Sequence, residues 1–144
     1  MSPISSSPFR RNWLIGGSFV ALFSSIALPA FAIEKCGPGP RYTCVVDGDT
    51  IWQDGEKIRL MGYDTPEPTT NICGGAVEVN LARRASDRLV QLLNQGNATI
   101  ERHGSDRYGR TLAIIRVAGV DVADTLVAEG LARYWPDGPE FWCE

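Results

Sequence analysis

Carboxylates and arginines gather in three short segments of this 144-residue chain. The first is Val45-Val46-Asp47-Gly48-Asp49-Thr50-Ile51-Trp52, in which two aspartates and a glycine interrupt an apolar run. The second places Arg59 in the apolar run 58–61 and continues into Asp64-Thr65-Pro66-Glu67. The third is Asp106-Arg107-Tyr108-Gly109-Arg110. Asp and Gly are unfavourable inside a strand, so the first segment in particular needs an explanation other than packing.

Three of these carboxylates have the ligand chemistry of a hard cation. Asp49, Asp64 and Glu67 offer oxygen atoms without a neighbouring set of His and Cys, which suits Ca²⁺ or Mg²⁺ rather than zinc. The first segment is not an EF-hand loop, because Ile51 and Trp52 follow where that loop needs Asp or Asn and then Gly. Carboxylates, a cation and arginine on one face suit an anionic substrate whose charge grows in the transition state.

Each segment also has a structural interpretation. Asp47-Gly48 is a common turn or bulge, Arg59 can pair with a neighbouring aspartate, and the segment 64–67 can begin a helix or turn. Together, in this order and spacing, the three segments favour a site. His103 lies in a turn without a partner motif and is expected on the surface. The tryptophans are expected in the core or as caps: Trp52, Trp135 and Trp142.

The elements that position the first two segments are predicted to form a hairpin. A strand is expected over 42–53, a primed two-residue turn at Asp54-Gly55, and a returning strand over 57–61. Asp49 and Arg59 would then share one face. The prolines after Asp64 end the second strand and begin a loop to about residue 75, which can bring Asp64 and Glu67 to the same end.

The rest of the chain is predicted to be α+β. Apolar residues at helical spacing predict a helix over 76–94, closed by Gly96, and a second helix over 122–131. Two further strands are expected over 99–102 and 111–117. This order of elements favours a small closed barrel.

The N-terminus has the pattern of an export signal. A basic start ending in Arg10-Arg11, an apolar run over 13–28 and an Ala-x-Ala site predict a signal peptide, 1–32, cut after Ala32. The alternative is a membrane anchor, for which the run is short and rich in small residues. The residues before Cys36 do not form a lipobox, and the route, general or twin-arginine, is left open. An irregular leader, 33–43, and one domain, 44–144, would remain, in the periplasm or secreted.

Cysteines and charge constrain the mature part. Four cysteines in an exported chain predict two disulfides, with three pairings open; the one we favour joins Cys36 to Cys44 and Cys73 to Cys143. Without the two signal arginines, 12 basic and 17 acidic residues remain, a net charge of −5. That balance argues against a basic nucleic-acid-binding surface, so a phosphate partner must be held by local arginines or by a cation.

Four motifs resemble the staphylococcal nuclease (thermonuclease) family: VVDGDTIW, KIRLMGYDTPE, DRYGRTLAIIRV and VADTLVAEGLARY. The resemblance runs from about Cys44 to Trp135. It implies a five-stranded OB-type β-barrel with two α-helices, the family's third, C-terminal helix being absent. It further implies a Ca²⁺-dependent nuclease that acts on DNA and RNA and leaves 3′-phosphate ends. We expect a monomer without stable membrane association.

The resemblance also implies roles for individual residues. The calcium ligands would be Asp49, Asp64 and the backbone carbonyl of Thr65, and Glu67 would orient or deprotonate the attacking water. The scissile phosphate would be bound by Arg59 and Arg110. The rest of the nucleotide would contact Asp106, Arg107 and Tyr108.

The chain also departs from the family. A lysine-rich loop after the glutamate is replaced by residues 68–73, and Pro136 replaces a tyrosine, for which Tyr134 and Trp135 can offer another stacking surface. In place of the third helix, we expect Phe141 and Trp142 to pack over the end of the barrel, held by a disulfide of Cys143.

Two other functions fit the same fold: a binding module that has lost catalysis, and a disulfide-stapled structural domain. A decayed module is expected to lack at least one of the five residues of the site. All five are present, which favours the enzyme: Asp49, Arg59, Asp64, Glu67 and Arg110.

Overall fold

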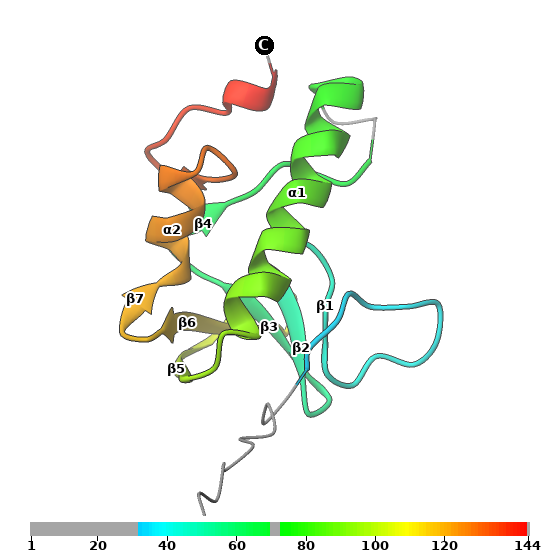
Figure 1. The fold of residues 1–144 in the computed structure, drawn as a ribbon, viewed down its shortest axis with the longest axis vertical. Helices are drawn as coiled ribbons and strands as arrows, with labels where there is room; N and C mark the ends of the chain where they lie inside the picture. The colour runs from blue at the N-terminus through cyan, green and yellow to red at the C-terminus, as the bar shows by residue number, and fades with distance from the viewer. Residues whose placement is uncertain (1–31, 70–72, 144) are drawn as a thin grey trace, which may run out of the picture.

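The computed structural model describes residues 32–69 and 73–143 (Figure 1). The expected signal peptide therefore lies outside the described residues, apart from Ala32. Within the described ranges, no helix has the length and apolar character needed to cross a membrane.

The chain reverses direction at the first acidic segment. Strands β1 (Cys44–Val45) and β2 (Thr50–Gln53) are antiparallel, so the single strand expected over 42–53 is wrong. The backbone N–H groups of Val46 and Asp47 both donate to the carbonyl of Thr50, at 2.9 and 3.3 Å. The Asp49 N–H donates to Oδ1 of Asp47 at 3.1 Å, which closes the turn from inside. Asp47 and Gly48 therefore shape the backbone.

The remaining sheet follows the predicted hairpin. Strand β2 pairs with β3 (Glu56–Leu60) through Asp54 and Gly55, whose φ angles of 51° and 82° confirm the primed turn. Strand β3 runs parallel to β6 (Thr111–Val117). Two other strands flank β6 in antiparallel pairing: β5 (Ala98–Ser105) and β7 (Val120–Asp121).

The predicted closed barrel is not found among the described residues. Pairing runs in the order β1-β2-β3-β6-β5 and does not return from β5 to β1. The free edge of β1 is taken by the leader, because Cys36 N–H donates to the Val45 carbonyl and Val45 N–H donates to the Glu34 carbonyl, both at 2.8 Å. The architecture is α+β with an open mixed sheet.

Two helices cover the sheet (Figure 1). Helix α1 (Gly75–Leu93) matches its predicted range to within a residue at each end. Helix α2 (Val122–Ala128) ends earlier than predicted, because Gly130 takes a left-handed φ of 68° and Leu131 N–H returns to the Leu126 carbonyl. A short pair, β4 (Tyr63–Asp64) and β8 (Arg133–Tyr134), was not predicted.

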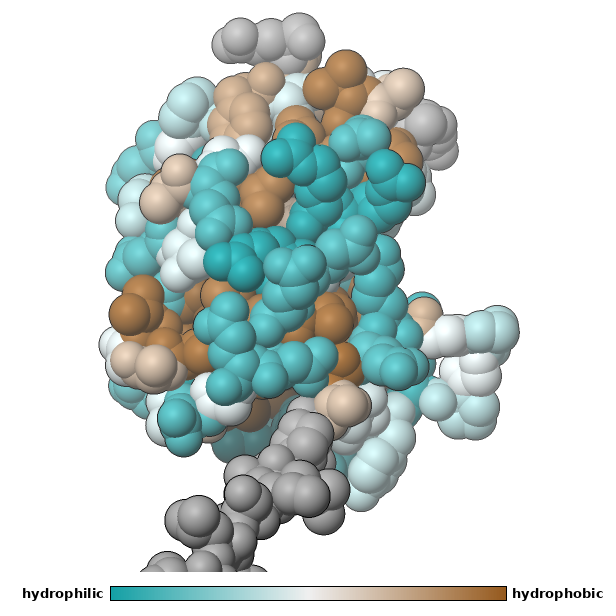
Figure 2. Space-filling view, viewed as in Figure 1, coloured by the Kyte–Doolittle hydropathy of each residue, from teal (hydrophilic) through white to brown (hydrophobic). Residues whose placement is uncertain are grey.

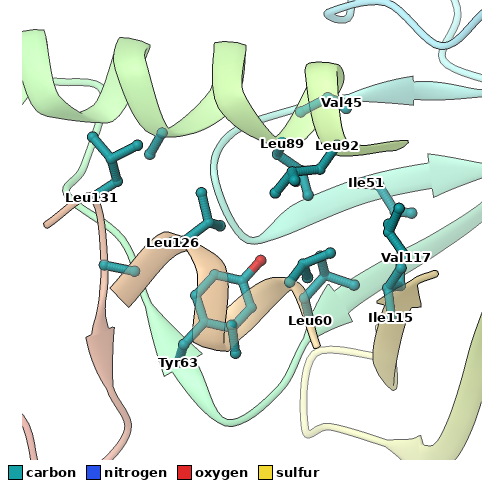
Figure 3. Packing of buried hydrophobic residues seen from close by; sticks show 14 of the residues in the cluster. Val45, Ile51, Leu60, Tyr63, Leu89, Leu92, Ile115, Val117, Leu126 and Leu131 are labelled. Carbon is teal, nitrogen blue, oxygen red and sulfur yellow. The ribbon is translucent and has the colours of Figure 1, made fainter. Parts of the chain in front are cut away.

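The core lies between α1, α2 and the sheet (Figure 3). Leu89, Ile51 and Leu126 bring the three layers together, each 0–1% exposed. Hydrophilic side chains cover most of the face that carries α1 (Figure 2). Ile33 also belongs to the core, and the Asn94 side chain bonds both its N–H and its carbonyl at 2.8 Å. The first residue of the predicted leader is therefore packed in the core of the domain.

Both favoured disulfides, Cys36–Cys44 and Cys73–Cys143, are present in the structure. Trp142, in the 3-10 turn η1 (Phe141–Cys143), is 3% exposed. It packs on the first turn of α1, where a Cβ at Gly74 would collide with the Trp142 carbonyl oxygen. The expected burial of Trp142 and the disulfide of Cys143 are confirmed, but the tail packs against the start of α1, and Phe141 stays 37% exposed.

Candidate active site

Asp49 connects the first acidic turn to the loop after β4. Its Oδ1 accepts from the Thr50 hydroxyl at 3.0 Å. Its Oδ2 accepts from the N–H and the hydroxyl of Thr65, at 3.2 and 3.0 Å. Asp49 is 6% exposed, so these donors offset the cost of burying its charge. The sequence segments 47–50 and 64–67 are thereby held together.

Gly48 allows this close approach. A Cβ at this position would lie 2.6 Å from Cγ2 of Thr65 and 2.8 Å from Cβ of Ala85 in α1. The Gly48 carbonyl accepts from the buried hydroxyl of Tyr63 at 2.8 Å. Burial raises the pKa of Tyr63 well above its ordinary value, so this phenol stays protonated and serves as a donor.

Arg59 bridges two carboxylates. Its Nη1 pairs with Oδ1 of Asp49, and its Nη2 donates to Oδ1 of Asp64 at 3.1 Å. The register places Thr50 opposite Arg59 across β2 and β3, so Asp49 lies beside the guanidinium. The structure brings together the three charged groups that the hairpin prediction expected to meet.

Arg133 is a site residue that sequence reasoning missed. It lies opposite Asp64 in the β4–β8 pair, and its Nη2 is 3.2 Å from Oδ2 of Asp64. The same guanidinium donates to the carbonyl of Gly138 and to Oε1 of Glu140, each at 2.7 Å. Its side chain is 10% exposed. The arginine within the apolar stretch 131–135 was the signal that could have found it.

The Glu67 side chain is exposed beside this cluster. Partial burial and the nearby charges of Asp47 and Asp64 raise the pKa of Glu67 above its ordinary value. Burial likewise raises the pKa of Asp47, against the effect of its hydrogen bonds with Thr50. The carboxyl groups of Asp47, Asp64 and Glu67 therefore lie close together, although arginines are among them.

The third segment forms a turn between β5 and β6. Asp106 accepts from the backbone N–H groups of Tyr108 and Arg110 and from Nε of Arg110, at 2.7 to 2.9 Å. Arg59 pairs in register with Leu112, so Arg110, two residues earlier, lies on the same side of the β3–β6 pair. The guanidinium groups of Arg107 and Arg110 lie 4.8 and 5.5 Å from the ring centre of Tyr108, which is 67% exposed.

The donor set fits a hard cation. Asp49 and Asp64, both paired with Arg59, supply carboxylate oxygen atoms on adjacent segments, as Ca²⁺ prefers. In this arrangement Arg59 balances both aspartates, so a cation would compete with its guanidinium. Within the described ranges, the one group of three or more acidic, His or Cys residues with metal-ligand spacing is Cys73, Glu140 and Cys143, so the aspartates at Arg59 do not form such a group with a third carboxylate in this arrangement. Its two cysteines are joined in a disulfide and cannot serve as thiolate ligands.

The aromatic and histidine expectations had mixed outcomes. His103 is exposed, as predicted, but it lies on strand β5, 3.1 Å from Glu101, and not in the predicted turn. Trp52 is partly buried and Trp142 is buried, but Trp135 is 58% exposed and is not a core residue. Its ring lies 5.1 Å from the Arg133 guanidinium.

The chain is similar to known nucleases. Residues 57–140 match the family described as staphylococcal nuclease homologue. Endonuclease YncB of Bacillus subtilis (strain 168) is 40% identical over 95 residues, which cover 61% of this chain and 44% of YncB. The thermonuclease of Staphylococcus intermedius is 34% identical over 108 residues, covering 67% of this chain and 61% of that protein. The chain thus spans less than two thirds of either relative. Because the family match takes in more than half of the chain, the chain belongs to the staphylococcal nuclease homologue family.

Proposed function

We propose that this protein is a calcium-dependent nuclease that hydrolyses phosphodiester bonds of DNA or RNA and leaves 3′-phosphate ends. The observation that carries the proposal is the Arg59 guanidinium, held between Asp49 and Asp64. A planar guanidinium fixed in place matches the oxygens of a phosphodiester, whose charge increases as water attacks. The relatives named as endonuclease and thermonuclease support the same reaction class.

The charge balance supports a cation requirement. The four carboxylates of the cluster outnumber its two arginines, Arg59 and Arg133; the carboxylates are those of Asp47, Asp49, Asp64 and Glu67. An anionic substrate would be repelled there unless a further positive charge is present. Ca²⁺ bound by Asp49, Asp64 and the Thr65 carbonyl would supply that charge and stabilise the growing charge on the phosphate.

The other residues have roles that follow from their placement. Arg59 and Arg110, on the same side of the β3–β6 pair, would bind the scissile phosphate. The exposed Glu67 carboxylate would orient the water or take its proton, since its raised pKa makes it a stronger base than an ordinary glutamate. Asp106 fixes Arg110, while Arg107 and Tyr108 would contact the neighbouring nucleotide.

We further propose that the enzyme acts as a monomer outside the cytoplasm, after cleavage of the signal peptide at Ala32. Two disulfides in a domain of this size suit an oxidising compartment. N-terminal sequencing of the protein recovered from the periplasm or medium tests this: a chain starting at Ile33 is expected. An uncleaved chain in the cytoplasm would contradict it.

The decisive experiment is digestion of plasmid DNA and RNA by the purified, oxidised protein. We expect cleavage with Ca²⁺, none after a calcium-selective chelator, and fragments that a polymerase extends only after phosphatase treatment. Replacing Arg59 or Arg110 with Ala should raise the barrier by about 3–4 kcal/mol. Replacing Arg84, exposed on the outer face of α1, is the matched control and should leave the rate unchanged. No digestion with any divalent cation would instead indicate a binding module.

A further inference from the structure

Glu78 is a buried charge that the proposed reaction does not use. It lies in the first turn of α1 and is 0% exposed. A carboxylate is rarely buried in this way unless its oxygens are fully bonded, because removing it from water is costly. Its bonding partners therefore indicate its role.

The Glu78 carboxylate binds the backbone at two separate places. Oε1 accepts from the N–H of Glu67 at 3.1 Å. Oε2 accepts from the N–H groups of Cys73 and Gly74, at 3.1 and 2.8 Å. Burial raises the pKa of Glu78, but these backbone bonds outweigh it and leave the pKa below its ordinary value, so the side chain is ionised at neutral pH.

The bond to Glu67 completes a clamp on three consecutive residues. Thr65 is held by Asp49 through its N–H and its hydroxyl. Pro66 is fully buried and its ring restricts φ. Glu67 is held by Glu78 through its N–H. The backbone is thus fixed on both sides of Pro66, while Glu67 as a whole residue remains exposed to solvent.

We propose that Glu78 is a positioning residue for Glu67: its buried carboxylate fixes the backbone from which the Glu67 side chain reaches the reacting water. The inference rests on the proposed nuclease function. The same carboxylate also joins this backbone to the start of α1, where Gly74 has no side chain for capping. The support for the water-activating group therefore comes from the helix and not from the loop itself.

The alternative is that Glu78 only caps α1, and the two roles predict different kinetics. Glu78→Gln keeps the size of the side chain but turns an NH₂ group toward N–H donors, so at least one of the three bonds is lost. Asp121→Ala is the matched control, because Asp121 caps α2 by accepting from Ala123 N–H at 2.9 Å and does not touch Glu67.

The test measures kcat and KM on single-stranded DNA at a temperature where all variants are folded. For Glu78→Gln we expect kcat to fall by about 10²-fold with KM near the wild-type value, as for a misplaced catalytic group. Asp121→Ala should keep the wild-type kcat. In a double-mutant cycle, Glu78→Gln should have no further effect on kcat once Glu67→Gln is present. If Glu78→Gln fails to fold, Glu78→Asp keeps the charge with a shorter reach and should show the same fall in kcat.

The inference is overturned if Glu78→Gln or Glu78→Asp keeps the wild-type kcat, or if the effects of the Glu67 and Glu78 substitutions multiply. Amide hydrogen exchange gives a readout that does not require catalysis. Exchange at the Glu67 N–H should accelerate in Glu78→Gln, and unchanged protection there would also overturn the inference. A wild-type protein that cleaves nothing would refute the proposed function, whereas an active wild type with an equally active Glu78→Gln refutes only the role of Glu78.

Discussion

Replacing Gly48 with Ala tests whether the first acidic turn must press against the site. The added Cβ would lie 2.6 and 2.9 Å from Cγ2 and Cβ of Thr65 and 2.8 Å from Cβ of Ala85. Neither neighbour yields easily. Thr65 is bonded twice to Asp49, and the Ala85 Cβ is attached directly to the backbone of α1 and is 0% exposed. Either the turn or the Thr65 segment has to move.

We expect Gly48→Ala to lower the free energy of unfolding by about 2–3 kcal/mol, the upper part of the range for overpacked positions. The displaced Thr65 carries a proposed calcium ligand, so the calcium concentration for half-maximal nuclease activity should rise. Urea denaturation at pH 7 measures the first effect, and a calcium titration of the cleavage rate measures the second.

Gly37→Ala is the control, since a Cβ there has no neighbour within 4 Å and Gly37 has no left-handed φ. It should change the free energy of unfolding by no more than about 0.5 kcal/mol. If Gly48→Ala is as stable as Gly37→Ala, the close contact of the turn with Thr65 is wrong. If it is destabilised but needs no more calcium, the link from the turn to the metal site is wrong.

Three further predictions concern the tail, the disulfides and pH. Arg133→Ala should cost about 2 kcal/mol of stability in thermal unfolding, because it removes one of the two guanidinium partners of the partly buried Asp64, whereas the exposed Arg116→Ala should cost almost nothing. Removing Cys73–Cys143, which spans 70 residues, should cost about 4 kcal/mol, against about 2.5 for Cys36–Cys44, which spans 8; equal losses in urea would contradict this chain-entropy estimate. The lowered pKa of Glu78 means that it stabilises the fold above its ordinary pKa of 4.5 and loses this effect as pH falls through its lower folded value. The stability gap between wild type and Glu78→Gln should therefore narrow from pH 7 to pH 3 in urea denaturation, and a constant gap would contradict the assignment.

Elements set by local chemistry were predictable from the sequence. Helix α1 has apolar residues at helical spacing, and the Asp54-Gly55 turn takes the left-handed conformations that these residues tolerate. The reversal at 46–49 was not predictable in the same way, because two apolar runs around Asp-Gly-Asp fit a bulged strand as well as a hairpin. Only the carbonyl of Thr50, which accepts two N–H groups, distinguishes them.

The supporting residues were harder to find than the charged motifs. Arg133 meets Asp64 through strands of two residues, which are too short for any periodic pattern. Glu78 looks like an ordinary acidic residue in the first turn of a helix, where carboxylates are common on the solvent side. The one sequence signal was the preceding Gly74-Gly75 pair, in which Gly74 offers no side chain for the cap. Arg133 and Glu78 are identified as supporting residues by the burial of their side chains and by their bonding partners, and not by their residue types.

Under the proposed function an acidic domain acts on an acidic polymer, and the pairing of the arginines offers a physical reason. Arg59 is bonded to Asp49 and Asp64, and Arg110 is bonded to Asp106, so in this arrangement both guanidinium groups are balanced by aspartates. If a divalent cation balanced Asp49 and Asp64, Arg59 could donate its hydrogen bonds to a phosphate without leaving either carboxylate uncompensated. Phosphate affinity would then depend on the cation and not on a basic surface, which residues 33–144, with a net charge of −5, do not provide.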